Sequence, residues 1–241
     1  MKILILGINY APEPVGIGPY TTGMANHLVA AGHQVTVVCG KPYYPAWRID
    51  PAYAGRKVMQ TVEDGVRVVR LPLYVPAMPN GRRRVMHHAS FAARAQSAML
   101  AEACRLRPDL VIAIAPSLIS ALAARTTARL FGAKLWLHVQ DFEVEAAFAT
   151  GLLSDKGMVG RAALGFETWS LHADRISTIS PQMCAKLLDR GIPADRVIEF
   201  RNWASIDQIT PLAGPSPYHA EWQIDRPHVA LYSGNIANKQ G

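Results

Sequence analysis

The fold of this chain is decided by its first 20 residues, Met1-Lys2-Ile3-Leu4-Ile5-Leu6-Gly7-Ile8-Asn9-Tyr10-Ala11-Pro12-Glu13-Pro14-Val15-Gly16-Ile17-Gly18-Pro19-Tyr20. The apolar run at the start is too short for a helix and predicts a buried strand. Apolar side chains then recur at helical spacing from Tyr20 to Ala31. A strand, a glycine-bearing loop and a helix in succession direct backbone N–H groups and the positive end of a helix dipole at an anion. Gly16 and Gly18 allow close approach to a ligand and a positive φ, so the segment predicts a phosphate-bearing or sugar-bearing ligand.

Strand-length apolar runs alternate with helix-length segments along most of the chain. The expected strands are 3–6, 34–39, 66–71, 110–115, 134–139, 175–179 and 197–200, and the expected helices are 20–31, 82–106, 118–131, 158–172 and 181–189. Repeated βαβ units give a mostly parallel sheet with helices on both faces. We therefore predict a doubly wound, Rossmann-like α/β domain whose ligands bind beyond the carboxyl ends of the strands.

The composition changes after Asp207. Residues 210–217 are rich in Pro and Gly and predict a linker, and residues 229–232 predict one more strand. We expect an amino-terminal domain over 1–207, a linker over 208–227 and the start of a second domain over 228–241. Because one strand and part of a loop cannot make a domain, the sequence predicts a chain cut short as its second domain begins.

The composition is that of a globular protein, since half of the 241 residues are hydrophobic. Cys39, Cys104 and Cys184 are widely spaced and lack metal-binding spacing, so we expect free thiols in a reducing cytoplasm. No signal peptide is expected. The longest run that contains neither charged residues nor histidine, 110–124, is interrupted by Pro116 and is shorter than the roughly 20 residues that span a bilayer.

The net charge of +7 is concentrated between Lys41 and Arg107, which carry 12 Lys and Arg against four Asp and Glu. The densest cluster is Arg82, Arg83 and Arg84, at the start of an expected helix. Such a surplus indicates either an anionic partner or a solvated basic face. The cluster lies beside apolar residues rather than on a nucleic-acid-binding module, which favours an anionic membrane surface over nucleic acid.

The glycine loop is not a dinucleotide fingerprint. That motif needs G-x-G-x-x-G directly after the first strand and an acidic residue at the end of the second. Here only Gly7 lies near the strand end, and the second strand ends in Val38-Cys39-Gly40. The sequence therefore argues against a nicotinamide-dependent enzyme.

Five segments in order resemble glycosyltransferase family 4, the retaining sugar transferases with the GT-B fold, and especially the bacterial enzymes similar to colanic acid glycosyltransferases. They are 9–18, 137–143, 179–187, 201–207 and 232–241. The resemblance implies two Rossmann-like domains, the amino-terminal one holding mainly the acceptor and the carboxy-terminal one most of the nucleotide-sugar donor. It also implies transfer of a sugar to a glycan or lipid-linked acceptor in cell-surface polysaccharide biosynthesis, in the cytoplasm or at the inner face of the membrane. No cofactor or metal is expected.

The resemblance implies that Gly16, Ile17 and Gly18 bind the donor phosphates or the transferred sugar. It implies that Asn235 and Lys239 bind the donor from the opposite wall of the cleft. Backbone N–H groups there would stabilise the negative charge of a departing nucleoside diphosphate. The family usually has a basic residue where this chain has Asn235, which lowers the expected positive charge of that wall.

His138 matches the active-site histidine of the family, and Asp141 follows it as a second catalytic candidate. From the residues alone, His138 would be a strand-end histidine satisfied by local hydrogen bonds, and Asp141 a helix cap. Acids at 141, 143 and 145 on one short segment do not show the separated carboxylate pair that a glycoside hydrolase needs.

The acceptor candidates are Tyr43, Tyr44 and Trp47, in the loop after the second strand, and Glu143. Aromatic rings in such loops stack on sugars, although the neighbouring prolines also explain a merely rigid loop. The donor-binding carboxylates of the family belong to the second domain. We therefore expect little transferase activity from this chain alone, and the alternative is a non-catalytic module that binds an acceptor or a membrane.

Overall fold

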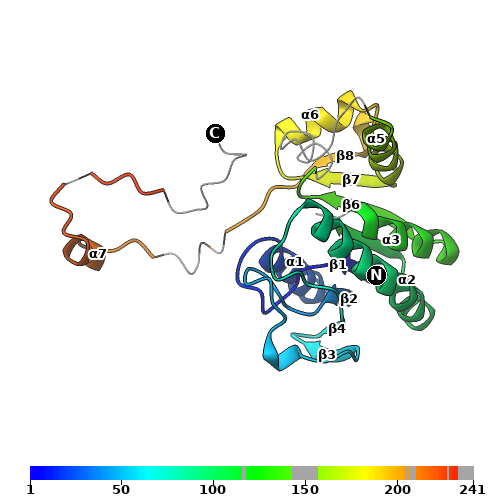
Figure 1. Ribbon diagram of the computed structural model, residues 1–241, viewed down its shortest axis with the longest axis horizontal. Coiled ribbons are helices and arrows are strands. Elements are labelled where there is room, and N and C mark those ends of the chain that lie inside the picture. The colour runs from blue at the N-terminus through cyan, green and yellow to red at the C-terminus, as the bar shows by residue number, and fades with distance from the viewer. Residues whose placement is uncertain (116–117, 143–156, 205, 207–209, 227, 233–241) are drawn as a thin grey trace. The chain divides into compact units, whose positions relative to one another are not determined.

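A computed structural model of the chain (Figure 1) describes residues 1–115, 118–142, 157–204, 206, 210–226 and 228–232. The chain divides into two compact units, Met1–Arg201 and Asn202–Gly241. The first unit contains one eight-stranded sheet in the order β3-β4-β2-β1-β5-β6-β7-β8. Its strands are β1 (Lys2–Gly7), β2 (Gln34–Gly40), β3 (Met59–Glu63), β4 (Val66–Leu71), β5 (Leu110–Ala115), β6 (Lys134–Val139), β7 (Arg175–Thr178) and β8 (Val197–Glu199).

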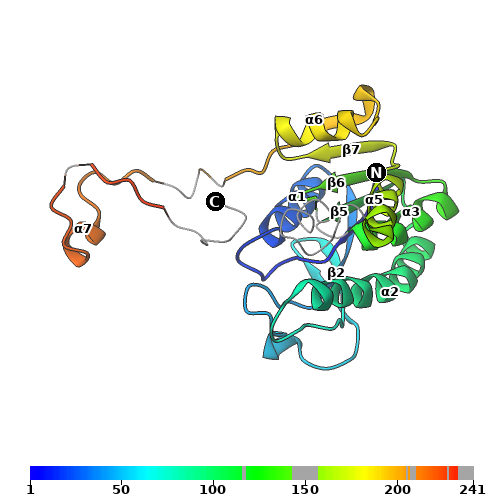
Figure 2. The ribbon, with the colours of Figure 1, turned by 45° about the horizontal axis from the view of Figure 1, so that its top comes forward.

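Helices cover both faces of this sheet. They are α1 (Gly18–Ala30), α2 (Gly81–Leu106), α3 (Leu118–Phe131), α5 (Met158–Ser170) and α6 (Pro181–Asp189). Helices α2 and α3 lie side by side and pack on β1, while α1 packs on β2 and β4 (Figure 1). Helix α6 runs alongside β7 (Figure 2). Within the described ranges, no helix is both long and apolar enough to cross a membrane.

The central strands are apolar on both sides because each face has its own core. Leu4 and Leu6 of β1 belong to the cluster that includes Phe91 of α2, whereas Ile3 and Ile5 belong to the cluster that includes Met24 of α1. Strands buried on both faces give continuous apolar runs rather than alternating ones. The predicted doubly wound α/β fold is confirmed.

Strand β3 was not predicted from the sequence. It pairs antiparallel with β4 at the edge of the sheet, and Asp64 and Gly65 join the two strands with φ of +48° and +79°. An Asp-Gly pair of this kind is a strong hairpin signal. The apolar pattern of the sequence did not predict the strand, because it is an exposed edge strand with few apolar residues.

In the second unit, the described residues form one short helix, α7 (Pro217–Glu221), in which the rings of Tyr218 and Trp222 stack at 4.7 Å. The strand expected over 229–232 is not formed. Val229, Leu231 and Tyr232 are exposed, and none is in a sheet with another described segment. Because a strand exists only by pairing, apolar sequence alone does not produce one here.

Candidate active site

The candidate active site lies at the carboxyl edge of the sheet. Five neighbouring strands of the sheet are parallel, in the spatial order β2-β1-β5-β6-β7. Their carboxyl ends therefore share one edge. The loops that leave this edge include 8–17 after β1, 41–58 after β2 and 140–142 after β6. The sequence-predicted loops are therefore brought to the same side of the domain.

The glycine loop has the positive φ that was predicted at one of its two glycines. Gly16 has φ +73°, and a Cβ there would lie 3.1 Å from Cε1 of Tyr44. The same prediction for Gly18 is wrong, because Gly18 begins α1 and its φ is not in the left-handed region. Gly18 is instead needed for close packing, since a Cβ would lie 3.1 Å from Cβ and 3.2 Å from the carbonyl oxygen of Glu13.

The start of α1 has features of an anion site. Its N-cap, Ile17, makes no side-chain capping hydrogen bond, and the first turn has no acidic residue. The positive end of the helix dipole is therefore not neutralised from within the helix. The side chain of Ile17 is partly buried and packs against the core on the α1 face.

Glu13 is a buried carboxylate that joins two loops. Its Oε1 accepts hydrogen bonds from the backbone N–H groups of Tyr43 and Tyr44, both at 2.9 Å, and its Oε2 accepts one from Nδ2 of Asn9 at 2.8 Å. Burial raises the pKa of Glu13, while these three hydrogen bonds oppose the rise. The glycine loop and the loop after β2 are thus fixed to each other through one side chain.

The aromatic acceptor candidates differ in exposure. Tyr43 is only 6% exposed and belongs to the core, although it also lines a small surface pocket, and its contact with an acceptor stays a prediction. Its ring packs against His87 at 4.6 Å and Trp47 at 5.5 Å, which holds the loop in place. Tyr44 and Trp47 are half-buried, and Trp47 has the unusual φ of +50°. These two rings remain available at the surface.

A small pocket opens between these two loops. Its volume is about 210 Å³, and Pro12, Glu13, Pro14, Pro42, Tyr43, Tyr44, Ala46, Arg48, Ile49, Asp50 and Pro51 line it. Sites that enclose a drug-sized ligand have roughly 300–1,000 Å³. The pocket is therefore large enough for a group of about the size of a single sugar ring and too small for a drug-sized ligand.

His138 is buried near the end of β6, with only 1% of its surface exposed. Its Nδ1 lies 2.8 Å from Oγ of Ser177, and its Nε2 lies 2.8 Å from Nε2 of Gln140. An amide N–H donor at Nε2 places the ring proton on Nδ1, which then donates to Ser177. Nε1 of Trp136 also donates to the same Oγ, at 2.7 Å. Both ring nitrogens are satisfied locally, and burial lowers the pKa of His138 to about 4.

The structure places the remaining candidates as follows. Asp141 is exposed two residues past β6, next to the buried Phe142. Glu143, Asn235 and Lys239 lie outside the described residues.

The arginine cluster lies at the start of α2. Asn80 caps that helix by accepting a hydrogen bond from the backbone N–H of Arg83 at 3.0 Å. Arg82, Arg83 and Arg84 are all exposed. The guanidinium of Arg84 lies over the ring of Trp47, 5.3 Å from its centre. The cluster is therefore in contact with the aromatic loop after β2.

Sequence reasoning missed three buried charges at this edge. Glu13 is 5% exposed, and Lys41 and Arg70 are each 1% exposed. Lys41 donates to the carbonyl oxygen of Gly55 at 2.8 Å, and Arg70 donates to that of Ala11 at 2.7 Å. A charged residue within or directly after an apolar strand was the available signal, because such a group must find a partner inside the fold.

Two histidines predict a loss of stability in acid. Burial lowers the pKa of both His138 and His87 to about 4, against 6.5 ordinarily. The unfolded chain takes up protons first as the pH falls, so the stability from each neutral ring is present above pH 6.5 and lost toward pH 4. We expect a loss of up to about 3 kcal/mol per histidine. Urea unfolding between pH 7 and 4 measures this loss. His138→Gln and His87→Gln should each reduce the dependence of the free energy of unfolding on pH. The same dependence in wild type and in both variants would contradict the prediction.

The comparisons with known proteins agree with this architecture. A family model described as a glycosyl transferase 4-like domain matches residues 15–203. This chain belongs to that family. The resemblance predicted from the five segments is confirmed. WcaI of Escherichia coli (strain K12), named as a colanic acid biosynthesis glycosyl transferase, is 40% identical to it over 248 residues. The match covers 100% of this chain and 60% of WcaI, so the chain spans about three-fifths of that relative's length.

Two solved structures place this glycosyl transferase 4-like chain in a larger fold. Sucrose-phosphate synthase from Thermosynechococcus elongatus matches with a TM-score of 0.64 and 18% identity, over 93% of this chain and 52% of that one. UGT89C1 from Arabidopsis thaliana, complexed with UDP-L-rhamnose, matches with a TM-score of 0.54 and 14% identity, over 94% and 55%. At these identities the likeness concerns the fold alone. The chain has the architecture of the amino-terminal half of a GT-B fold.

Proposed function

We propose that this chain forms the acceptor-side half of a retaining glycosyltransferase. It would take part in transferring a sugar from a nucleotide-sugar donor to a glycan or lipid-linked acceptor in cell-surface polysaccharide biosynthesis, at the cytoplasmic side of the membrane. In this proposal residues 1–207 are the acceptor domain, 208–227 a linker and 228–241 the beginning of the donor domain. The 40% identity to WcaI along the whole chain supports the reaction class and the process.

The fixed position of the glycine loop is the observation that carries the proposal. Glu13 holds this loop against the loop after β2, so that Gly16 and the start of α1 lie beside the small pocket. A departing nucleoside diphosphate gains negative charge, and backbone N–H groups already in place stabilise it without rearranging. The family resemblance adds Asn235 and Lys239 as further groups that would bind the diphosphate.

His138 acts in this proposal as a positioning residue. With both nitrogens engaged and a pKa near 4, its ring is neutral at pH 7 and does not serve as a general acid. It orients Gln140 through the contact at Nε2, and Gln140 and the exposed Asp141 would contact the acceptor. Tyr44 and Trp47 would flank the sugar at the pocket.

Complementation of an E. coli strain that lacks WcaI tests the reaction class. A fusion of residues 1–227 to the remaining carboxy-terminal part of WcaI should restore colanic acid production. The same fusion with Gly16→Val should fail, because a β-branched side chain at φ +73° would displace Tyr44. A folded fusion that does not restore production, beside a WcaI control that does, would refute the proposal.

A membrane-docking function has its own supporting observation. Beside the exposed Arg82 and Arg83, the same surface presents Met78, Val85 and Met86, which are 72%, 58% and 51% exposed. Basic side chains beside exposed apolar ones suit an anionic lipid surface. This docking would bring a lipid-linked acceptor to the pocket.

Vesicle flotation gives the corresponding prediction. Replacing Arg82 and Arg83 by alanine should weaken binding to phosphatidylglycerol vesicles by roughly thirtyfold, at about 1 kcal/mol per basic side chain. Arg84 is left in place because it also packs on Trp47. The matched control, Arg56→Ala with Arg94→Ala, removes two other exposed arginines and should bind as wild type. Equal loss in both variants would show that only net charge matters.

A further inference from the structure

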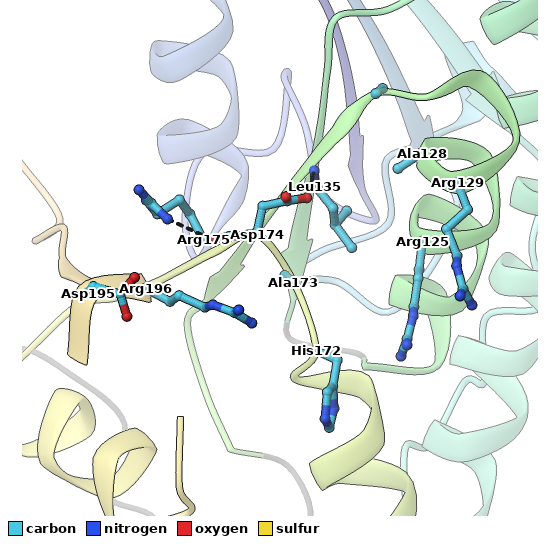
Figure 3. A pocket seen from close by; sticks show the side chains of 11 residues that line it. Arg125, Ala128, Arg129, Leu135, His172, Ala173, Asp174, Arg175, Asp195 and Arg196 are labelled. Carbon is cyan, nitrogen blue, oxygen red and sulfur yellow. Dashed lines mark hydrogen bonds between the residues drawn. The ribbon is translucent and has the colours of Figure 1, made fainter. Parts of the chain in front are cut away.

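A second, larger pocket lies at the opposite edge of the sheet (Figure 3). Its volume is about 450 Å³, and its lining includes Leu135 near the start of β6 and Arg175 at the start of β7. In a parallel sheet the amino ends of the strands are on the edge away from the carboxyl ends. This pocket is therefore separate from the candidate active site, and the proposed function gives it no role.

Arginines from three elements line this pocket. Arg125 and Arg129 lie one turn apart on α3 and therefore on the same face of that helix. Arg175 begins β7, and Arg196 lies in the short 3₁₀ helix Ala194–Arg196. Figure 3 shows Arg196 extending from one side toward the α3 arginines on the other, with His172 below them. Compensation of one helix dipole would explain Arg129 in the last turn of α3, but not arginines from the other two elements.

The carboxylates of the pocket do not cancel this charge. Asp174 is already engaged, since its Oδ2 accepts from the backbone N–H of Leu135 at 2.9 Å and its Oδ1 pairs with Nζ of Lys134 at 3.0 Å. These contacts lower the pKa of Asp174 and keep it ionised. Asp195 is the other carboxylate that lines the pocket. Arg175 points away from the other arginines in Figure 3, and its Nη1 donates to the carbonyl oxygen of Asp174 at 3.0 Å. Three guanidinium groups, those of Arg125, Arg129 and Arg196, thus lie beside two carboxylates, one of which is paired with Lys134 outside the pocket lining.

The arginines are partly preorganised. Nη1 of Arg125 donates to the carbonyl oxygen of Trp169 at 2.8 Å, and the guanidinium lies 4.5 Å from the centre of the Trp169 ring. Arg196 is close enough to Asp174 to help lower the pKa of that carboxyl, and among the described residues neither Arg129 nor Arg196 has a side-chain hydrogen bond or salt bridge. An anion with several oxygens would relieve the repulsion between these groups and accept hydrogen bonds from them.

We propose that this pocket binds a small, soluble polyanion that carries a diphosphate or two phosphate groups. The lining also includes the apolar side chains of Ala128, Ala133, Leu135 and Ala173, against which the uncharged part of the ligand would rest. The volume is within the roughly 300–1,000 Å³ of small-molecule sites and exceeds what one phosphate needs. Planar guanidinium groups bind phosphate oxygens in pairs, which favours a ligand with more than one phosphate.

Calorimetry on the full chain tests this, with inorganic pyrophosphate and inorganic phosphate as probes at matched ionic strength. We expect pyrophosphate to bind at least tenfold more tightly than phosphate. Arg129→Ala with Arg196→Ala should weaken pyrophosphate binding by a factor of roughly one hundred, about tenfold for each charge-assisted contact. Arg129→Lys with Arg196→Lys keeps the positive charges but not the paired N–H donors of the guanidinium groups. It should weaken pyrophosphate binding less than the alanine variant does. The control, Arg56→Ala with Arg94→Ala, should bind as wild type.

Three results would overturn the proposal. They are pyrophosphate binding no tighter than phosphate, undiminished binding in the folded Arg129→Ala/Arg196→Ala variant, and an equal loss in the control. The second result would place the anion elsewhere on the chain, including the start of α1. Circular dichroism of each variant establishes that it is folded, which we expect because all four replaced side chains are exposed.

Discussion

Replacing Arg70 by methionine is expected to lower the free energy of unfolding by about 3 kcal/mol. The side chain is 1% exposed and pairs with Glu63 through two contacts, Nη1 to Oε1 at 2.6 Å and Nη2 to Oε2 at 2.9 Å. Nη2 also donates to the carbonyl oxygen of Ala11 in the glycine loop. Methionine keeps the apolar stem but removes the guanidinium from Glu63, which retains only the hydroxyl of Thr61 as a donor, and from that carbonyl.

Urea unfolding of matched variants measures this effect. Lys134→Met breaks the exposed pair with Asp174 and should cost at most about 1 kcal/mol. The double variant Arg70→Met/Glu63→Gln should recover part of the loss, because it does not leave the Glu63 carboxylate without its cation. If Arg70→Met destabilises the chain no more than Lys134→Met does, Arg70 does not anchor the loop.

Replacing Glu13 by alanine is also expected to cost about 3 kcal/mol. The change leaves the N–H groups of Tyr43 and Tyr44 without an acceptor, and each unsatisfied buried group costs about 1–3 kcal/mol. Glu13→Gln retains one acceptor oxygen and should lose only about 1 kcal/mol at pH 7. Urea unfolding again gives the values, and equal losses in the two variants would contradict the acceptor role.

The same residue predicts a pH dependence opposite in sign to that of the histidines. Burial raises the pKa of Glu13 above its ordinary 4.5, so the folded chain holds the proton more tightly than the unfolded chain. Its contribution to stability is therefore fully present below pH 4.5 and is lost as the pH rises through the folded pKa. Glutamine does not titrate, so the advantage of wild type over Glu13→Gln should shrink with rising pH. A difference that grows instead would show that the hydrogen bonds outweigh burial.

Most of the parallel sheet could be predicted because its strands are short apolar runs separated by helix-length segments. The predicted boundaries of 66–71 and 118–131 match β4 and α3 at both ends. Strand β3 could not be found in this way, since an edge strand carries little apolar signal. The prediction of a strand over 229–232 was wrong for the opposite reason. The sequence there is apolar, but a strand forms only when it pairs with another segment.

The candidate site was predictable in position but not in detail. Motif spacing located Gly16 and His138, and the sheet brings both near one edge. Spacing could not show that Tyr43 turns inward while Tyr44 and Trp47 stay accessible, because burial depends on what packs against the loop. It also could not show the network of Ser177, His138 and Gln140, which joins strands β6 and β7 with the loop after β6.

The sequence by itself determined the fold class, the family and the edge of the sheet where chemistry is expected, because apolar periodicity and motif order are local properties of the chain. Only the tertiary structure decided which charges are buried and what each one holds. Glu13 and Tyr43 are 30 residues apart, and Arg70 and Ala11 are 59 apart. The pocket at the opposite edge likewise gathers arginines from residues 125 to 196. A charge that leaves water is stable only beside a partner, and that partner is supplied by the packing of distant segments.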